Sequence, residues 1–181
     1  MFNVSAMPSS HISKITYQYL RPSQVFESIY DIDFGSFWDE GIRHLFFDVD
    51  NTLISYKETN VSIQCLNLFN SIKSIEFDNV ILVSNNSSVD RIQKVAKSLD
   101  LPGVSFACKP FVFTMRRIMT QLNVDPSKSA FIGDQLLTDV LMANLLNMTS
   151  IFVDPIDLSN ISITKSIQYK LQLQIMRSFY R

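Results

Sequence analysis

The chain has 181 residues, of which 46% are hydrophobic, and its formal net charge at pH 7 is −1. This length and apolar content suit one domain with one core, and the near-neutral charge argues against a nucleic-acid partner. No apolar run approaches the roughly 20 residues that cross a bilayer, so we expect neither a spanning helix nor a secretory signal. The two cysteines, Cys65 and Cys108, lack metal-site spacing, and we therefore expect a reduced, cytoplasmic compartment.

Five short apolar runs, rich in β-branched or aromatic residues, alternate along the chain with segments of helical periodicity. The runs cover residues 45–47, 80–83, 104–108, 130–132 and 149–153, and the helical segments cover residues 61–72, 92–99, 115–122 and 137–145. Strand alternating with helix is typical of parallel sheets with right-handed crossovers. We therefore predict an α/β fold, a Rossmann-like three-layer sandwich around a mainly parallel five-stranded sheet.

The first run ends in two carboxylates, Asp48 and Asp50, at positions i and i+2. Side chains two apart on extended backbone point to the same side, so both acids would lie at the carboxyl edge of the sheet, where open α/β folds bind ligands. The alternative is a strand that simply runs into an Asx-type turn at residues 50–52.

Polar residues also follow the next three runs. Ser84 and Asn85 follow the second run, Lys109 follows the third, and Asp134 follows the fourth, with Asp139 five residues further on. Because parallel strands end at the same edge of a sheet, we expect these side chains to share one site with the paired acids.

This order of motifs resembles that of the haloacid-dehalogenase-like (HAD) phosphohydrolases, and the resemblance covers about residues 19–158. The stretches 19–22 (Tyr-Leu-Arg-Pro), 28–33 (Ser-Ile-Tyr-Asp-Ile-Asp) and 133–139 (Gly-Asp-Gln-Leu-Leu-Thr-Asp), with the Asp-Val-Asp-Asn-Thr-Leu core, are similar to the subclass IIIA branch called the YqeG family. Its eukaryotic relatives include mitochondrial phosphatidylglycerophosphate phosphatases.

The chemistry of phosphate esters suits these residues. An aspartate is ionised at neutral pH without a partner base and can form an acyl phosphate that water cleaves. As the first Asp of the family motif, Asp48 is assigned as the nucleophile. Asp50 would protonate the leaving oxygen and later deprotonate the attacking water.

Several acids beside a phosphate need compensating cations, since two like charges about 4 Å apart repel by about 4 kcal/mol at an effective dielectric near 20. An oxygen-rich site without a His or Cys cluster suits Mg²⁺. The resemblance implies the Asp48 carboxylate, the Asp50 backbone carbonyl and Asp134 as its ligands. Lys109 is the only other evident source of positive charge among the motifs.

The resemblance also implies how the phosphate is held. Ser84 and Lys109 would bind phosphoryl oxygens. Asn85 either assists them or only forms a turn. Asp139 would either contact the metal ligands without binding the metal itself or orient Lys109. Thr52 would contact the metal ligands without binding the metal.

The spacing of the motifs leaves no room for the cap domains that this superfamily inserts after its first or second motif. Only 34 residues separate Asp50 from Ser84, and 25 separate Ser84 from Lys109. Each gap holds about one crossover helix and its loops. Residues 53–59 can form at most a small flap. An open site suits a bulky phosphorylated group, or a small substrate enclosed by an oligomer partner, and the oligomeric state stays open.

The two ends differ in charge from the middle. We divide the chain into an N-terminal extension (1–18), a phosphatase domain (19–158) and a basic amphipathic C-terminal segment (159–181) with Lys165, Lys170, Arg177 and Arg181 but no acid. That segment either packs as a helix with its cations in water or lies on an anionic membrane, which would place the protein at the inner membrane surface. The acid-free N-terminus is compatible with an organellar presequence.

We therefore expect a Mg²⁺-dependent phosphomonoester hydrolase that acts through an aspartyl-phosphate, on phosphatidylglycerophosphate or another bulky phosphorylated substrate. A phosphatase of a small soluble metabolite or phosphoprotein is the alternative. A non-catalytic binding module with the same fold is disfavoured, because Asp48, Asp50, Ser84, Lys109 and Asp134 are all intact.

Overall fold

The computed structural model describes residues 18–159 and 163–179, so nearly all of the predicted N-terminal extension lies outside the described residues. Within them, six strands form one sheet in the order β1-β6-β5-β2-β3-β4, and every neighbouring pair is parallel. The strands are β1 (Gln24–Phe26), β2 (His44–Phe47), β3 (Asn79–Val83), β4 (Gly103–Val104), β5 (Ser129–Gly133) and β6 (Thr149–Val153). The predicted α/β class with a parallel sheet is confirmed.

The prediction of five strands was wrong by one, because β1 was missed. This strand has only three residues, pairs with β6 at the edge of the sheet and carries no long apolar run. Ser23, just before it, donates its backbone N–H to the carbonyl oxygen of Ser150 at 2.8 Å. The strand is therefore fixed by long-range pairing that periodicity does not reveal.

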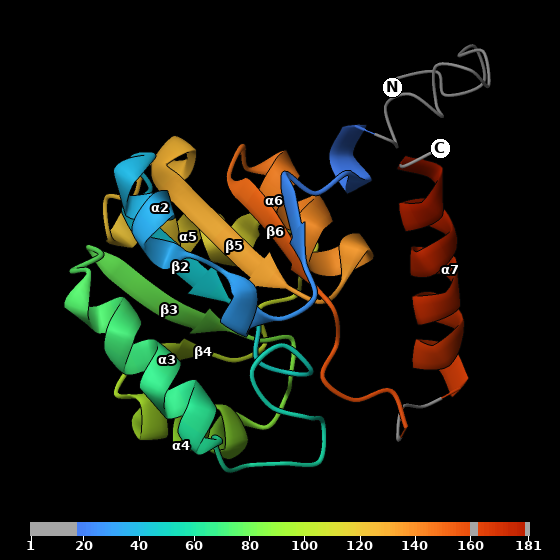
Figure 1. Cartoon of the computed structure of the whole chain (residues 1–181), viewed down its shortest axis with the longest axis horizontal. Coiled ribbons are helices and arrows are strands. Elements are labelled where there is room, and N and C mark those ends of the chain that lie inside the picture. The colour runs from blue at the N-terminus through green and yellow to red at the C-terminus, as the bar shows by residue number, and fades with distance from the viewer. Residues whose placement is uncertain (1–17, 160–162, 180–181) are drawn as a thin grey trace.

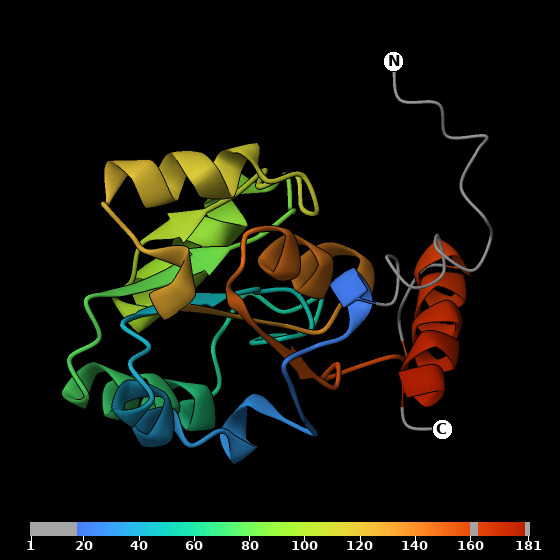
Figure 2. The ribbon, with the colours of Figure 1, turned by 90° about the horizontal axis from the view of Figure 1, so that it is seen from above.

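Helices cover both faces of the sheet and create two cores (Figures 1 and 2). In β2, Leu45 and Phe47 pack with α2, α3 and α4, whereas Phe46 packs with α5 and α6. The helices are α2 (Phe34–Asp39), α3 (Ile63–Ser74), α4 (Val89–Leu99), α5 (Phe113–Gln121), α6 (Leu141–Leu145) and α7 (Ile163–Phe179), with short 3₁₀ turns η2 (Ile29–Asp31) and η3 (Pro126–Lys128). This alternation of side chains confirms the predicted three-layer sandwich.

Two predicted elements end differently from what the apolar pattern indicates. The run 104–108 is paired only at Val104, because β4 covers Gly103–Val104 and Phe106 and Cys108 have φ values of 52° and 58°, which are not extended conformations. The predicted helix over 137–145 begins as a π-helix, η4 (Leu136–Val140), before α6.

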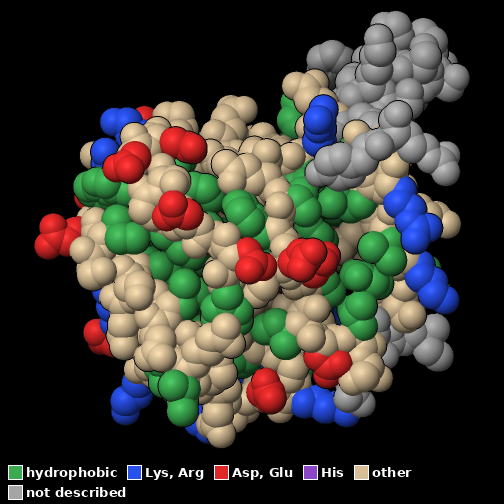
Figure 3. All heavy atoms as spheres, viewed as in Figure 1, with side chains coloured by type: hydrophobic (Ala, Val, Ile, Leu, Met, Phe, Trp, Pro, Cys, Tyr) green, Lys and Arg blue, Asp and Glu red, His purple; other side chains and the backbone are tan. Residues whose placement is uncertain are grey.

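The C-terminal helix α7 stands beside the sheet (Figures 1 and 2). Ile175 and Met176 pack against a small cluster formed by Leu136, Val140 and Phe152. Lys170 and Arg177 are exposed, whereas Arg181 lies outside the described residues. Lys and Arg side chains form a blue row at this edge of the molecule in Figure 3. No helix among the described residues is long and apolar enough to cross a membrane.

Candidate active site

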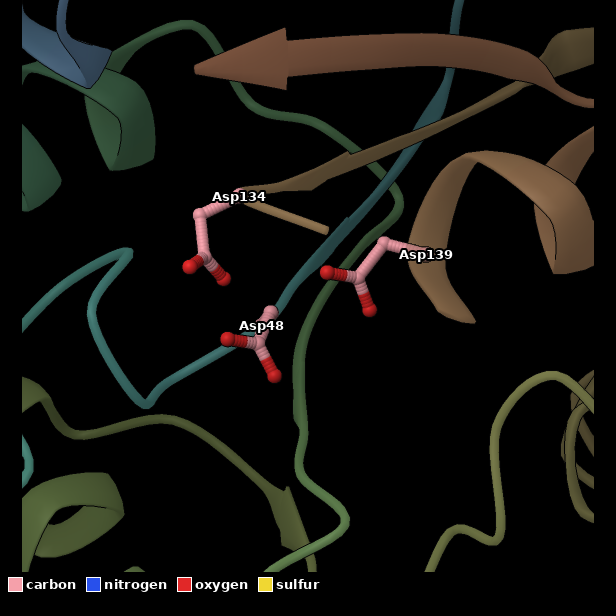
Figure 4. A group of neighbouring side chains, drawn as sticks. All are labelled: Asp48, Asp134 and Asp139. Atoms are coloured by element: carbon pink, nitrogen blue, oxygen red, sulfur yellow. The ribbon is translucent and has the colours of Figure 1, made fainter. Parts of the chain in front are cut away.

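Three carboxylates converge at the carboxyl edge of the sheet (Figure 4). Asp48 follows β2, Asp134 follows β5, and Asp139 lies in the π-helix η4. One oxygen from each lies within 4.8 Å of the others, and all three side chains are buried. The acids predicted from separate motifs therefore meet at one place.

Burial and mutual repulsion disfavour the ionised form of this cluster. Burial raises the pKa of Asp48 to about 7, and the charges of Asp139 and Asp50 act in the same direction, against the opposing effect of Lys109. The pKa of Asp134 lies well above its usual range, mainly because the side chain is buried and also because Asp48 and Asp139 are negatively charged. The donors are all carboxylate oxygens, so the cluster fits a hard divalent cation that would relieve this repulsion.

Lys109 is buried against two of the acids. Its Nζ lies 2.5 Å from Asp48 Oδ1 and 2.7 Å from Asp139 Oδ1, and it donates a hydrogen bond of 3.0 Å to the carbonyl oxygen of Val83. Burial acts to lower the pKa of Lys109, but the carboxylates of Asp139 and Asp48 outweigh it and hold the pKa above its ordinary value. The contact between Asp139 and Lys109 is an ion pair without hydrogen-bond geometry. That Asp139 orients Lys109 stays a prediction.

Gly133 makes room for that arrangement. A Cβ atom at this position would lie 2.5 Å from Cγ of Asp139, so any side chain would displace the carboxyl group. The backbone N–H of Gln135 donates to Asp139 Oδ2 at 3.1 Å. The fourth motif thus requires glycine at this position because the Asp139 carboxyl group approaches the Gly133 backbone closely.

Asp50 is held by a cation that the sequence analysis did not identify. Arg91 Nη1 lies 2.6 Å from Asp50 Oδ1, while Ser84 and Asn86 donate to Asp50 Oδ2 at 3.2 and 3.1 Å. The prediction that Lys109 and the metal alone compensate the charge of the acids was therefore wrong, because Arg91 pairs with Asp50. Arg91 lies 41 positions from Asp50 in the chain, so no local pattern links them.

Arg91 also holds the flap over residues 53–59. Its Nε donates to the carbonyl oxygen of Glu58 and its Nη2 to that of Ser55, both at 3.0 Å. Helix α4 starts after its N-cap Ser88, which accepts from the Arg91 backbone N–H and so places the arginine in the first turn. One side chain therefore joins Asp50, the flap and α4.

The residues predicted to bind phosphate or to support the ligands all lie in or beside the site. Ser84 is fully buried and donates to Asp50. Asn85 pairs with the Lys109 backbone in both directions, at 2.7 and 2.9 Å, as a turn-fixing residue does. The Thr52 hydroxyl lies 3.2 Å from Asp48 Oδ2 and 3.4 Å from an oxygen of Asp134.

An open cleft of about 360 Å³ leads to these residues. Its lining consists of Asp48, Asp50, Tyr56, Asn85, Asn86, Lys109, Gln135, Thr138, Lys165 and Gln168. Only α3 lies between β2 and β3, and only α4 between β3 and β4, so neither insertion point holds a cap domain. The sequence analysis did not assign Asn86, Gln135, Lys165 or Gln168 to the site; these residues reach the cleft from loops and from α7.

The parallel sheet and the acidic cleft are those expected of a phosphatase of the HAD superfamily, which hydrolyses phosphoric monoesters, and comparison with known proteins shows that the protein is of this class. A family model described as mitochondrial PGP phosphatase matches residues 9–156, and the chain belongs to this family. The probable phosphatase YqeG of Bacillus subtilis strain 168 is 27% identical over 148 residues, which cover 82% of this chain and 85% of that protein.

Two solved structures share the fold at low sequence identity. An uncharacterized protein from Listeria monocytogenes serotype 4b has a TM-score of 0.55 at 13% identity, covering 75% of this chain and 99% of that one. The cobalt-bound deoxy-D-mannose-octulosonate 8-phosphate phosphatase YrbI from Haemophilus influenzae has a TM-score of 0.50 at 13% identity, covering 76% and 89%. The resemblance seen in the sequence motifs is confirmed.

Proposed function

We propose that the protein is a Mg²⁺-dependent phosphatase that transfers the phosphoryl group first to Asp48 and then to water, with phosphatidylglycerophosphate as its substrate. The observation that carries this proposal is the position of Asp48 at the floor of the cleft. Its two carboxylate oxygens are held by Lys109 and Thr52, beside Asp134. A fixed, desolvated carboxylate is suited to attack a phosphorus atom.

In the first step, an oxygen of Asp48 forms a bond to phosphorus while the bond from phosphorus to the ester oxygen breaks. Asp50 must enter this step protonated, as the second step leaves it, and gives that proton to the leaving oxygen. In the second step, water loses a proton to Asp50 and attacks phosphorus, which breaks the bond to Asp48 and releases phosphate. In both steps, Lys109 stabilises the negative charge of the Asp48 carboxylate and of the phosphoryl group beside it.

The Asp48 and Asp134 carboxylates and the Asp50 backbone carbonyl would hold the metal, which supplies positive charge for the phosphoryl oxygens. Asp139 is linked to these residues through Lys109, whose Nζ lies 2.7 Å from Asp139 Oδ1. Ser84, which now donates to Asp50, is the side chain at the second motif that would turn to a phosphoryl oxygen.

Two features support a lipid substrate besides the family. The cleft is open, and three exposed aromatic side chains, Phe106, Phe111 and Phe113, surround Lys109 in the sequence, with exposed fractions of 55%, 61% and 67%. The Phe111 and Phe113 rings stack with centroids 5.8 Å apart. Exposed aromatic residues close to the motif lysine in the chain suit contact with a membrane surface, and the basic C-terminal segment would add attraction to anionic lipid.

The test is a comparison of substrates with purified protein and Mg²⁺. Phosphate release from phosphatidylglycerophosphate in mixed micelles should exceed release from sugar, nucleotide and phosphopeptide substrates at equal concentration. Asp48→Asn is the control and should release none. Preference for a soluble sugar or nucleotide phosphate would replace the lipid proposal with the alternative, a phosphatase of soluble metabolites.

A further inference from the structure

Helix α7 lies beyond the residues that the family model matches, which end at 156, yet it lines the catalytic cleft. Lys165 and Gln168, one turn apart on this helix, face the same cleft as Asp48 and Lys109. Side chains of the helix are therefore placed to contact the part of the substrate to which the phosphoryl group is attached.

The position of α7 is fixed by a buried side chain. Gln172 is 2% exposed; it accepts a hydrogen bond from the Leu136 backbone N–H and donates one to the Asp134 carbonyl oxygen, each at 2.8 Å. Asp134 belongs to the acidic cluster. The helix is therefore anchored to the same backbone that carries a candidate metal ligand.

A chain of contacts then holds Lys165 at the mouth of the cleft. Gln168 donates to Gln135 Oε1 at 3.0 Å, and Gln135 donates to the Tyr56 hydroxyl at 3.2 Å. Lys165 Nζ lies 3.2 Å from the centroid of the Tyr56 ring, a cation–π contact. Tyr56 comes from the flap, so the flap and α7 together place this cation.

The two cations among the described residues that line the cleft have different surroundings. Lys109 lies at the floor, against Asp48 and Asp139, where the proposed mechanism places the reacting phosphoryl group. Lys165 lies over an aromatic face at the rim, and its residue is exposed. A cation at this second position would attract a second negatively charged group of the substrate, at a distance from the reacting phosphoryl group.

We propose that Lys165 and Tyr56 form a second anion subsite, which selects phosphomonoesters that also carry a phosphodiester group. This inference rests on the proposed phosphatase function. It assigns to α7 a role in specificity: Lys165 contacts the distal anion, and Gln168 and Gln172 hold the helix in place. The cleft volume of about 360 Å³ accommodates more than one phosphate group.

The experiment compares two soluble substrates. The first is p-nitrophenyl phosphate, which has one phosphoryl group. The second is glycerophosphoryl-glycerophosphate, which has a phosphomonoester and a phosphodiester but no acyl chain, so that membrane attachment does not contribute. Four proteins are measured with Mg²⁺: wild type, Lys165→Met, Lys165→Arg and the control Lys170→Met, which removes the same charge from an exposed position on the same helix.

Lys165→Met should lower the ratio of kcat/KM for the diester substrate to kcat/KM for p-nitrophenyl phosphate about tenfold, as expected for one lost charge-assisted hydrogen bond, mainly through KM. Lys165→Arg should restore the ratio, and Lys170→Met should leave it at the wild-type value. An unchanged ratio in Lys165→Met, or an equal drop in Lys170→Met, overturns the subsite while leaving the phosphatase intact. Failure of the wild type to hydrolyse either substrate overturns the proposed function and the subsite with it.

Discussion

Raising the pH of the metal-free protein should lower its free energy of unfolding, because folding buries Asp48 where its ionised form is disfavoured. The pKa of this carboxyl rises from 3.8 to about 7 in the fold. The folded state thus binds the proton more tightly than the unfolded state, and the stabilisation is complete below pH 3.8 and is lost as the pH rises through 7. At about 1.4 kcal/mol for each pH unit, the loss between pH 4 and pH 8 is about 4 kcal/mol.

That loss is a large part of the roughly 5–15 kcal/mol that stabilises a typical domain. The raised pKa of Asp134 acts with the same sign. Urea unfolding at pH 4, 6 and 8 in chelator measures the effect, and Mg²⁺ added at pH 8 should restore stability. Asp48→Asn should remove about 4 kcal/mol of the pH dependence, whereas Asp39→Asn, at an exposed position, should not. The same dependence in Asp48→Asn as in wild type would refute the reasoning.

Four further predictions concern activity and attachment. Asp48→Asn should abolish turnover and Asp50→Asn should lower kcat by about 10²–10⁴, measured as phosphate release in folded variants; near-normal activity of either would remove its assigned role. Chelator should abolish activity and Ca²⁺ should restore it poorly, since its longer coordination misplaces the attacking carboxylate; activity that persists in chelator would contradict a metal site. Arg91→Leu should lower kcat about tenfold or more and speed proteolysis of the flap, with Arg91→Lys intermediate, because the ion pair to Asp50 and the two hydrogen bonds to flap carbonyl oxygens are lost. Unchanged proteolysis would mean that Arg91 does not hold the flap. The full-length protein should sediment with anionic liposomes at low salt and be released at high salt, and sedimentation with neutral liposomes alone would count against electrostatic attachment.

Among the site residues that the sequence predicted, Asp48 and Asp134 are placed by the strands they directly follow, β2 and β5, because parallel pairing brings the ends of these strands together. Lys109 follows an apolar run that is mostly not a strand, and its backbone is held by Asn85. Asp139 was harder to assign, because a π-helix and the close approach of Gly133 decide where its carboxyl group points.

The remaining site residues depend on contacts between distant segments, which a local pattern does not encode. Arg91 reaches Asp50 from another helix, and Gln172 binds backbone groups 36 and 38 positions away. Periodicity showed that the C-terminal segment has an apolar side but not what that side contacts. Strand β1 was missed for the same reason, since β6 holds its three residues.

The most direct test of the central claim is to trap a phosphoryl group on Asp48. With 2,4-dinitrophenyl phosphate the leaving group needs no proton, so Asp50→Asn should still be phosphorylated but should lose the base that activates water. After mixing with Mg²⁺ and quenching in acid, borohydride reduction and peptide mass analysis locate the acyl phosphate. We predict homoserine at position 48 in Asp50→Asn and none when Asp48 is also replaced by Asn. Dinitrophenol release in Asp50→Asn without modification of Asp48, or with the phosphoryl group on another residue, would contradict the proposed mechanism.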